Sequence, residues 1–198
     1  MTNIFASIGR GFAGLLRFSG RDAPGQFWPY ALFLVLLNFV AGFALMAPAI
    51  LESFTRMQRF AAEHPELTTV ESGPGPYEMR IEGYHPELMP DMSAMAGGFA
   101  VVAAVTVLLL AAAVARRLHD RDRRGWWGLM PLPFLLYGFA LMPRFFATFQ
   151  SGGPPPMRLF ASLFINNALY LAALAALVVL LVGAGTRGPN RFGEPPIR

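Results

Sequence analysis

The chain has 198 residues, of which 55% are hydrophobic and only 14% are charged, and its formal net charge is +4. Soluble domains carry about 25% charged residues, so this composition excludes a fully water-covered surface and predicts that lipid solvates part of the chain. Cysteine is absent, which excludes disulfides and thiolate metal ligands.

Residues 1–20 predict an amphipathic helix at the membrane interface. The apolar residues recur at helical spacing and share one face: Ile4, Phe5, Ile8, Phe12, Leu15 and Leu16. Arg10 and Arg17 fall on the opposite face, so the segment can lie in the headgroup plane with its apolar side among acyl chains. A short helix packed against the rest of the protein would show the same pattern.

Four apolar stretches are long enough for membrane-spanning helices: residues 27–51, 92–115, 125–143 and 159–183. A spanning helix needs roughly 20 apolar residues, so the third stretch qualifies narrowly. Pro131 and Pro133 interrupt that stretch, and its alternatives are a kinked helix and a re-entrant hairpin. The kinked helix is favoured because neighbouring groups can satisfy the freed backbone atoms. The sequence thus predicts an all-α integral membrane protein, a single membrane domain over residues 1–198.

The positions of arginine predict that both termini lie in the cytoplasm. All 16 basic residues are Arg, and 11 of them fall in the segments that are cytoplasmic if the N-terminus is inside. An excess of basic residues beside membrane spans marks the cytoplasmic side. Residues 52–91 then form an extracytoplasmic loop, and residues 184–198 form a cytoplasmic tail.

The loop 52–91 is polar and rich in Pro and Gly. We expect the first span to continue as a helix through Arg59 and the remainder to be irregular. The sequence His-Pro-Glu-Leu occurs twice, at 64–67 and at 85–88. Imidazole and carboxylate can bind zinc, but the spacing forms no closed ligand set, so no metal site is predicted.

The strongest local signal lies between the second and third stretches. Residues 116–124 contain five Arg, His119, Asp120 and Asp122, and Trp126 and Trp127 follow directly. A signal for topology with a Trp anchor at the interface would explain most of this composition. It does not explain the His or the closely paired opposite charges, and we expect the two Asp side chains to order the Arg side chains.

Three segments carry a resemblance to a known family: 18–21 with 27–28, 115–120 with 125–127, and 188–193. In this order they resemble the bacterial inner-membrane family catalogued as domain of unknown function 805, over about Leu16 to Pro196. The resemblance implies a small multi-pass protein of the bacterial inner membrane and supplies no activity, substrate or catalytic residue. The chain departs from the family at Pro24, commonly a basic residue, and at Arg124, commonly a small polar residue.

Under the predicted topology all three segments lie at the cytoplasmic membrane face, so they can converge there although they are far apart in the sequence. Convergent polar groups are typical of a binding site. The predicted ligand-binding cluster contains Arg21, Arg116, Arg117, His119, Asp120, Arg123, Asn190 and Arg191.

The favoured function is a non-enzymatic module that binds anionic headgroups or another phosphorylated ligand, because Arg forks match phosphate geometry. The alternative is a small transporter or channel subunit, which is weakened because the four stretches contain no ionisable residue. An enzyme with His119 as a base held by Asp120 is not favoured, since no nucleophile motif, phosphate loop or metal-ligand set accompanies the pair. His119 can also have a structural role, locking the hairpin through Asp120 or a backbone carbonyl.

The predicted partners are the lipid bilayer and its anionic headgroups, with a homo-oligomer allowed by small residues on the spans. Nucleic acid is not a predicted partner, because membrane topology accounts for the Arg residues. No cofactor is predicted.

Overall fold

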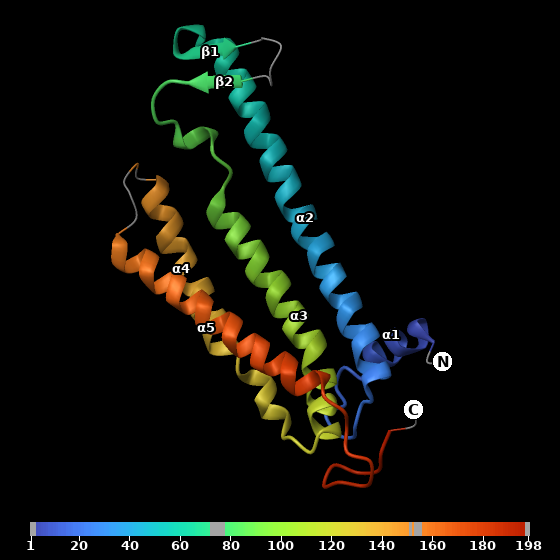
Figure 1. Ribbon diagram of the computed structural model, residues 1–198. Helices are drawn as coiled ribbons and strands as arrows, with labels where there is room; N and C mark the ends of the chain where they lie inside the picture. The colour runs from blue at the N-terminus through green and yellow to red at the C-terminus, as the bar shows by residue number, and fades with distance from the viewer. Residues whose placement is uncertain (1–2, 72–77, 151, 153–155, 197–198) are drawn as a thin grey trace.

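The protein is a bundle of four long helices in a computed structural model that describes residues 3–71, 78–150, 152 and 156–196 (Figure 1). A short helix α1 (Ile4–Ala13) precedes the long helices α2 (Pro24–Glu63), α3 (Met92–Asp120), α4 (Leu132–Gln150) and α5 (Met157–Val182). Among these described residues, four helical segments are long and apolar enough to cross a membrane. The predicted all-α fold with four candidate spans is therefore confirmed.

The long helices expose apolar side chains over most of their surface. In the most apolar window of each candidate span, only 6–17% of the residues are buried inside the protein. Phe39, Phe43, Leu108 and Leu136 are each about two-thirds exposed or more. Contact of such a surface with water is unfavourable by about 25 cal/mol per Å² of apolar area, so this surface suits lipid as its solvent.

The helices converge at the end that carries α1 and the segment after α5, called the terminal end below, and fan apart towards the other end (Figure 1). Polar contacts join neighbouring helices within the bundle. The Asn38 amide donates to the Thr106 hydroxyl at 2.8 Å between α2 and α3, and the Asn166 amide donates to the Phe134 carbonyl at 2.9 Å between α5 and α4. The largest fully buried side chains lie in the first half of α2 and the last turn of α3: Tyr30, Leu34, Arg117 and Leu118.

The third apolar stretch forms a 3-10 turn, η3 (Gly125–Leu129), followed by one continuous helix, α4. Nineteen residues of helix extend about 28 Å, close to the hydrocarbon thickness, and α4 runs antiparallel to α5 along the bundle (Figure 1). A re-entrant hairpin is therefore wrong for this stretch. The stretch is interrupted at Pro131, where the 3-10 turn gives way to α4, and Pro133 lies in the first turn of α4, where a missing backbone N–H costs little.

Residues 72–77 lie outside the described part of the segment 52–91, and the rest of it is more ordered than the irregular loop that we expected. Helix α2 continues to Glu63, and short 3-10 turns η1 (Pro65–Leu67) and η2 (Pro86–Leu88) flank an antiparallel hairpin of β1 (Thr68–Glu71) and β2 (Glu78–Ile81). Each His-Pro-Glu-Leu copy forms one of these turns, with its His at the N-cap. The rings of His64 and His85 both lie 4.5 Å from the Phe60 ring, so the repeat anchors both ends of the hairpin to α2.

Helix α1 combines the two interpretations of the N-terminal segment. It packs on α2, where the Ser7 hydroxyl donates to the Gly25 carbonyl at 3.1 Å and Gly11 lies flat against the Tyr30 ring. Any side chain at Gly11 would collide with that ring, since a Cβ would come within 2.3 Å of it. The Phe5 and Leu16 side chains nevertheless remain 83% and 92% exposed, as an interfacial segment requires.

Candidate functional site: a buried ion-pair cluster beside a basic recess

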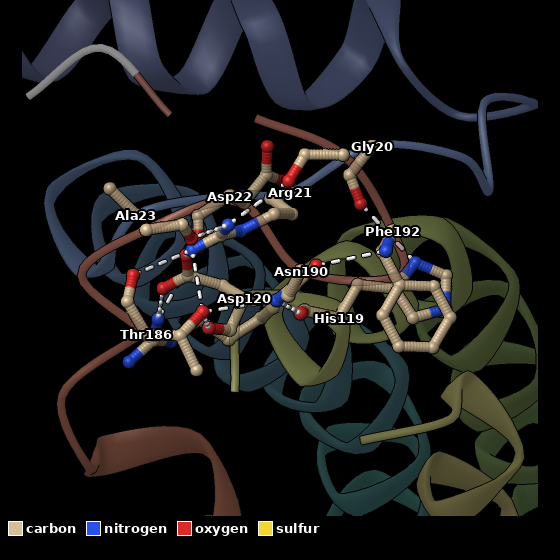
Figure 2. A network of polar contacts seen from close by, with 12 residues as sticks. Gly20, Arg21, Asp22, Ala23, His119, Asp120, Thr186, Asn190 and Phe192 are labelled. Carbon is tan, nitrogen blue, oxygen red and sulfur yellow. Dashed lines mark hydrogen bonds and ion pairs between the residues drawn. The ribbon is translucent and has the colours of Figure 1, made fainter. Parts of the chain in front are cut away.

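Three segments that are distant in the sequence meet at the terminal end: the loop before α2, the last turn of α3 and the tail after α5 (Figure 2). Backbone and side-chain hydrogen bonds join them directly. The Thr186 N–H donates to the Asp120 carbonyl at 2.9 Å, the Asn190 amide donates to the His119 carbonyl at 2.9 Å, and the Asp22 N–H donates to a carbonyl of α3 at 3.2 Å. The structure thus brings together the segments whose convergence the sequence predicted.

Arg21 ties the loop before α2 to both other segments. Its guanidinium pairs with the Asp120 carboxylate at 3.0 Å, and the two side chains are only 1% and 3% exposed. The remaining N–H groups donate to the backbone carbonyls of Thr186 at 2.8 Å, Gly188 at 2.9 Å and Gly193 at 3.2 Å. One buried side chain therefore closes the tail over the end of α3.

Arg117 joins α3 to the end of α5. Its side chain is fully buried, and its Nη1 donates to the second oxygen of Asp120 at 2.5 Å. Its other nitrogens donate to the carbonyls of Leu181 at 2.8 Å and Gly183 at 2.5 Å. The last carbonyls of a helix have no partner within it, so Arg117 supplies a cation where the end of α5 has its partial negative charge.

Arg116 holds the N-terminal segment. Its Nε donates to the Asp22 carboxylate at 2.8 Å, and its Nη1 donates to the carbonyls of Gly14 at 2.7 Å and Arg17 at 2.5 Å. The Arg116 and Asp22 side chains are 6% and 9% exposed. This pair therefore ties the chain between α1 and α2 to α3.

The buried cluster contains three guanidiniums, from Arg21, Arg116 and Arg117, and two carboxylates, from Asp22 and Asp120. Its formal charge is thus +1, and backbone carbonyls rather than a third carboxylate offset the excess. Buried charges are stable only when paired and hydrogen-bonded, and here the partners come from the protein itself. The predicted cluster residues Arg21, Arg116, Arg117 and Asp120 lie together, in an arrangement that fastens the three segments.

His119 and Asn190 complete the junction between α3 and the tail (Figure 2). The His119 Nδ1 lies 3.2 Å from the Gly20 carbonyl, which only accepts, so Nδ1 carries the hydrogen. The imidazole stacks on the Phe192 ring at a centroid distance of 3.9 Å and an interplanar angle of 5°. None of the described contacts joins the His119 ring to a carboxylate oxygen of Asp120, so the two residues do not form a His–Asp dyad. The ring and the carbonyl of His119 instead hold the loop before α2 and the tail against α3.

A basic recess lies beside the buried cluster. It has a volume of about 630 Å³ and is lined by Arg121, Asp122, Arg123, Arg124, Trp126, Trp127 and Arg191. Arg191 pairs with Asp122 at 3.0 Å, with side chains 50% and 48% exposed. Within the described part of the chain, the exposed guanidiniums of Arg123 and Arg124 contact no hydrogen-bond or ion-pair partner. Arg123 and Arg191 of the predicted cluster therefore lie here, apart from the buried group.

An apolar cavity of about 600 Å³ adjoins this recess. It lies among α2, α3, η3, α4 and α5, and Trp126 lines both the cavity and the recess. His119 and Gly125 also contribute to the cavity wall. The terminal end thus has an exposed basic surface next to an apolar cavity.

Around the buried cluster, Asp22, Thr186 and Phe192 were not predicted, and in the recess Arg121 and Arg124 lie outside the predicted cluster. Asp22 directly follows Arg21, so the same close pairing of opposite charges that singled out residues 116–124 was also present before α2. Thr186 acts through its backbone and through its hydroxyl, which accepts from Arg21 and from Asn190 at 3.0 Å, and a Thr in a polar tail gives no sign of these partners. Phe192 lies within the third segment of the resemblance, but an aromatic residue in a tail gives no sign of its partner.

The comparisons give a family and no closer relative. The model of the family described as "Protein of unknown function (DUF805)" matches residues 15–194, nearly the whole chain. Neither the curated proteins nor the solved structures yielded a match.

Proposed function

The chain belongs to the DUF805 family of proteins of unknown function, and on this premise we propose, from its geometry, that it binds anionic lipid headgroups. The proposed site is the basic recess, and the protein acts as a non-enzymatic module of a bacterial inner membrane. The role assigned to the buried cluster is to hold the recess in place.

The proposal places the basic recess on the cytoplasmic side of the membrane because of the arginine distribution. With the terminal end in the cytoplasm, 11 of the 16 Arg residues are cytoplasmic, as the charge bias of membrane proteins favours. The cytoplasmic leaflet carries anionic lipids, so a basic recess on this side faces its ligand. The exposed Phe5 and Leu16 of the N-terminal segment would then lie at the same interface.

The free guanidiniums of Arg123 and Arg124 are the observation that carries the proposal. The recess presents four Arg residues against the single carboxylate of Asp122, and its volume is within the range of small-ligand sites, roughly 300–1,000 Å³. An Arg fork donates two parallel hydrogen bonds to a phosphate. Trp126 and Trp127, whose rings lie 4.5 Å apart, suit the depth at which headgroups meet acyl chains.

A transporter or channel subunit is less well supported. Polar side chains within the four apolar stretches, such as Asn38 and Asn166, contact Thr106 and the Phe134 carbonyl inside the bundle. Charged groups usually mark ion and proton pathways, and these stretches contain none. A homo-oligomer remains a prediction on which the headgroup site does not depend.

Native mass spectrometry of the full chain tests the proposal. The protein in detergent is titrated with phosphatidylglycerol, with zwitterionic phosphatidylcholine and with soluble glycerol phosphate. We expect preferential retention of phosphatidylglycerol, whereas retention of glycerol phosphate alone would indicate a free phosphorylated metabolite as the ligand. Each basic residue near a charged lipid contributes about 1 kcal/mol, so Arg123→Gln with Arg124→Gln is expected to weaken binding by about ten- to thirtyfold.

The matched control is Arg10→Gln with Arg187→Gln, which removes the same charge from the terminal end outside the recess. These two side chains are exposed, so the control is expected to fold and to retain most of the binding. Equal losses of lipid binding in the two double variants would show that the recess is a nonspecific basic surface, which would contradict the proposal.

A further inference from the structure

The cavity that adjoins the basic recess has the composition of a site for a hydrocarbon chain. Most of the side chains that line it are apolar, and those from three helices include Val107, Leu110, Leu132, Leu135, Leu174 and Leu177. Asn38 and Thr106 also line the cavity, but they are hydrogen-bonded to each other at 2.8 Å. A cavity holds water only where polar groups supply it with several hydrogen bonds, so this one favours an apolar guest.

The neighbourhood of the cavity limits what that guest can be. Trp126 lines both the cavity and the recess, so one end of a molecule that fills the cavity can lie beside Arg123, Arg124 and Arg191. An apolar body with an anionic end matches both surfaces. A protein helix is about 10–12 Å wide with its side chains and carries no such charge at a fixed end, so it fits this combination less well.

We infer that the cavity holds one acyl chain of an anionic phospholipid whose phosphate is bound in the basic recess. This inference rests on the proposed function and extends it from a headgroup to a whole lipid. The cavity volume of about 600 Å³ suits one chain. The second chain remains in the surrounding bilayer.

The two parts of the site have different tasks. The bilayer interior is as apolar as the leucine side chains of the cavity, so moving a chain from one to the other gains little hydrophobic free energy. Selectivity for the lipid therefore comes from the guanidiniums of the recess. The cavity determines where the chain lies, and this position can be measured.

The test uses the full chain in nanodiscs with phosphatidylglycerol that carries a photoreactive diazirine in one acyl chain. Labelled residues are identified by peptide mass spectrometry, and a phosphatidylcholine analogue with the same chain serves as the comparison. Three cavity leucines, Leu110, Leu135 and Leu174, have outward-facing counterparts on the same helices, Leu108, Leu136 and Leu171. We expect phosphatidylglycerol to label the cavity leucines more strongly than their counterparts, and phosphatidylcholine to show no such preference.

A substitution that fills the cavity provides the second arm. Leu174→Trp places a large ring in the cavity, and the matched control Leu171→Trp adds the same ring to the exposed side of α5. Labelling of Leu110 and Leu135 is expected to fall to the level of the outward leucines in the first variant and to persist in the control. The wild-type labelling pattern decides the question even if Leu174→Trp does not fold.

The outcomes separate the two proposals. Uniform labelling of cavity and outward leucines by phosphatidylglycerol, with its preferential retention intact, overturns the inference and leaves headgroup binding standing. Equal labelling of the cavity by both lipids overturns the role of the recess and, with it, the assignment of the chain to an anionic lipid. Enrichment by phosphatidylglycerol that Leu174→Trp abolishes supports both.

Discussion

Arg21 and Asp120 are 99 residues apart in the sequence and form an ion pair at 3.0 Å in which both side chains are almost completely buried. Asp120 also forms an ion pair with Arg117, so one carboxylate is the counter-charge of two buried guanidiniums. This arrangement makes Asp120 the central member of the buried cluster. The site therefore has an interior that holds the chain segments together and an exposed part that is open to a ligand.

Removing the charge of Asp120 is expected to destabilise the protein strongly. Asp120→Asn leaves Arg21 and Arg117 buried without their shared counter-charge, and breaking a buried pair typically costs about 3–5 kcal/mol. The measurement is thermal or denaturant unfolding of the detergent-solubilised protein.

Asp122→Asn is the matched control, because the Asp122–Arg191 pair is about half exposed and such pairs contribute about 0–1 kcal/mol. Asn also tolerates the positive φ of 55° at this position, so the control changes charge without backbone strain. Equal stability losses in the two variants would show that the buried cluster is not what holds the terminal end together.

Arg116→Gln with Arg117→Gln is expected to lower stability more than it lowers headgroup affinity. Both guanidiniums donate to the protein's own carboxylates and carbonyls, so their loss breaks contacts between α3, α5 and the N-terminal segment. The folded fraction, isolated by size-exclusion chromatography, should retain phosphatidylglycerol in native mass spectrometry more strongly than Arg123→Gln with Arg124→Gln does. The reverse order would place the ligand at the buried cluster.

The spans were predictable because apolar length is a local property, but the ends of the helices were not. Helix α2 runs on past the expected end at Arg59 to Glu63, and α3 runs past its apolar stretch to Asp120. A helix can continue through charged residues when neighbouring segments supply hydrogen-bond or ion-pair partners for them. A hydropathy pattern does not reveal those partners. The hairpin around β1 and β2 escaped prediction for the same reason, since its anchors are the contacts of His64 and His85 with Phe60.

The location of the candidate site could be predicted from the sequence, but the role of each Arg in it could not. An even number of spans brings the three segments to one end, which is why Arg21, His119 and Asn190 were expected to converge. Whether an Arg is buried or free depends on the position of each carboxylate and carbonyl in space. Arg117 and Arg123 look alike in the sequence, but one is fully buried and the other lines an open recess.

His119→Gln is expected to retain most of the stability. The Gln amide can still donate to the Gly20 carbonyl, whereas the ring stack with Phe192 is lost, and such aromatic pairs contribute about 0.5–1.5 kcal/mol. Phe192→Leu should therefore cost a similar amount, and the double substitution should cost little more than either single one. Additive losses in this double-mutant cycle would contradict the stacking role.

The hairpin of the segment 52–91 is expected to respond to pH through His85. Hydrogen bonds with the Glu87 carboxylate and then with the Glu82 carbonyl raise the pKa of His85 above its ordinary 6.5. A backbone hydrogen bond at Glu87, and then its hydrogen bond with His85, lower the pKa of Glu87 below its ordinary 4.5. The stabilisation from His85 is therefore complete below pH 6.5 and is lost as the pH rises through the raised pKa. The contribution of Glu87 is lost as the pH falls through its lowered pKa.

Measurement of the His85 ring signals by NMR across this range gives the pKa directly. Glu87→Gln removes the main cause of the shift, so the pKa should return towards 6.5. His64, which contacts Phe60 in the same way, provides an internal comparison in the same spectra. A His85 pKa that does not move in Glu87→Gln would show that the carboxylate is not its partner in solution.

The sidedness of the protein can be tested with single cysteines, because the chain has none of its own. The exposed positions Glu82, Asp122 and Glu194 represent the hairpin segment, the basic recess and the tail. The arginine distribution predicts that an impermeant thiol reagent labels Glu82→Cys in intact cells and leaves Asp122→Cys and Glu194→Cys unlabelled. All three must react after permeabilisation. External labelling of Glu194→Cys with protection of Asp122→Cys would mean that α4 does not cross, whereas external labelling of both would invert the topology and place the basic recess away from the anionic cytoplasmic leaflet.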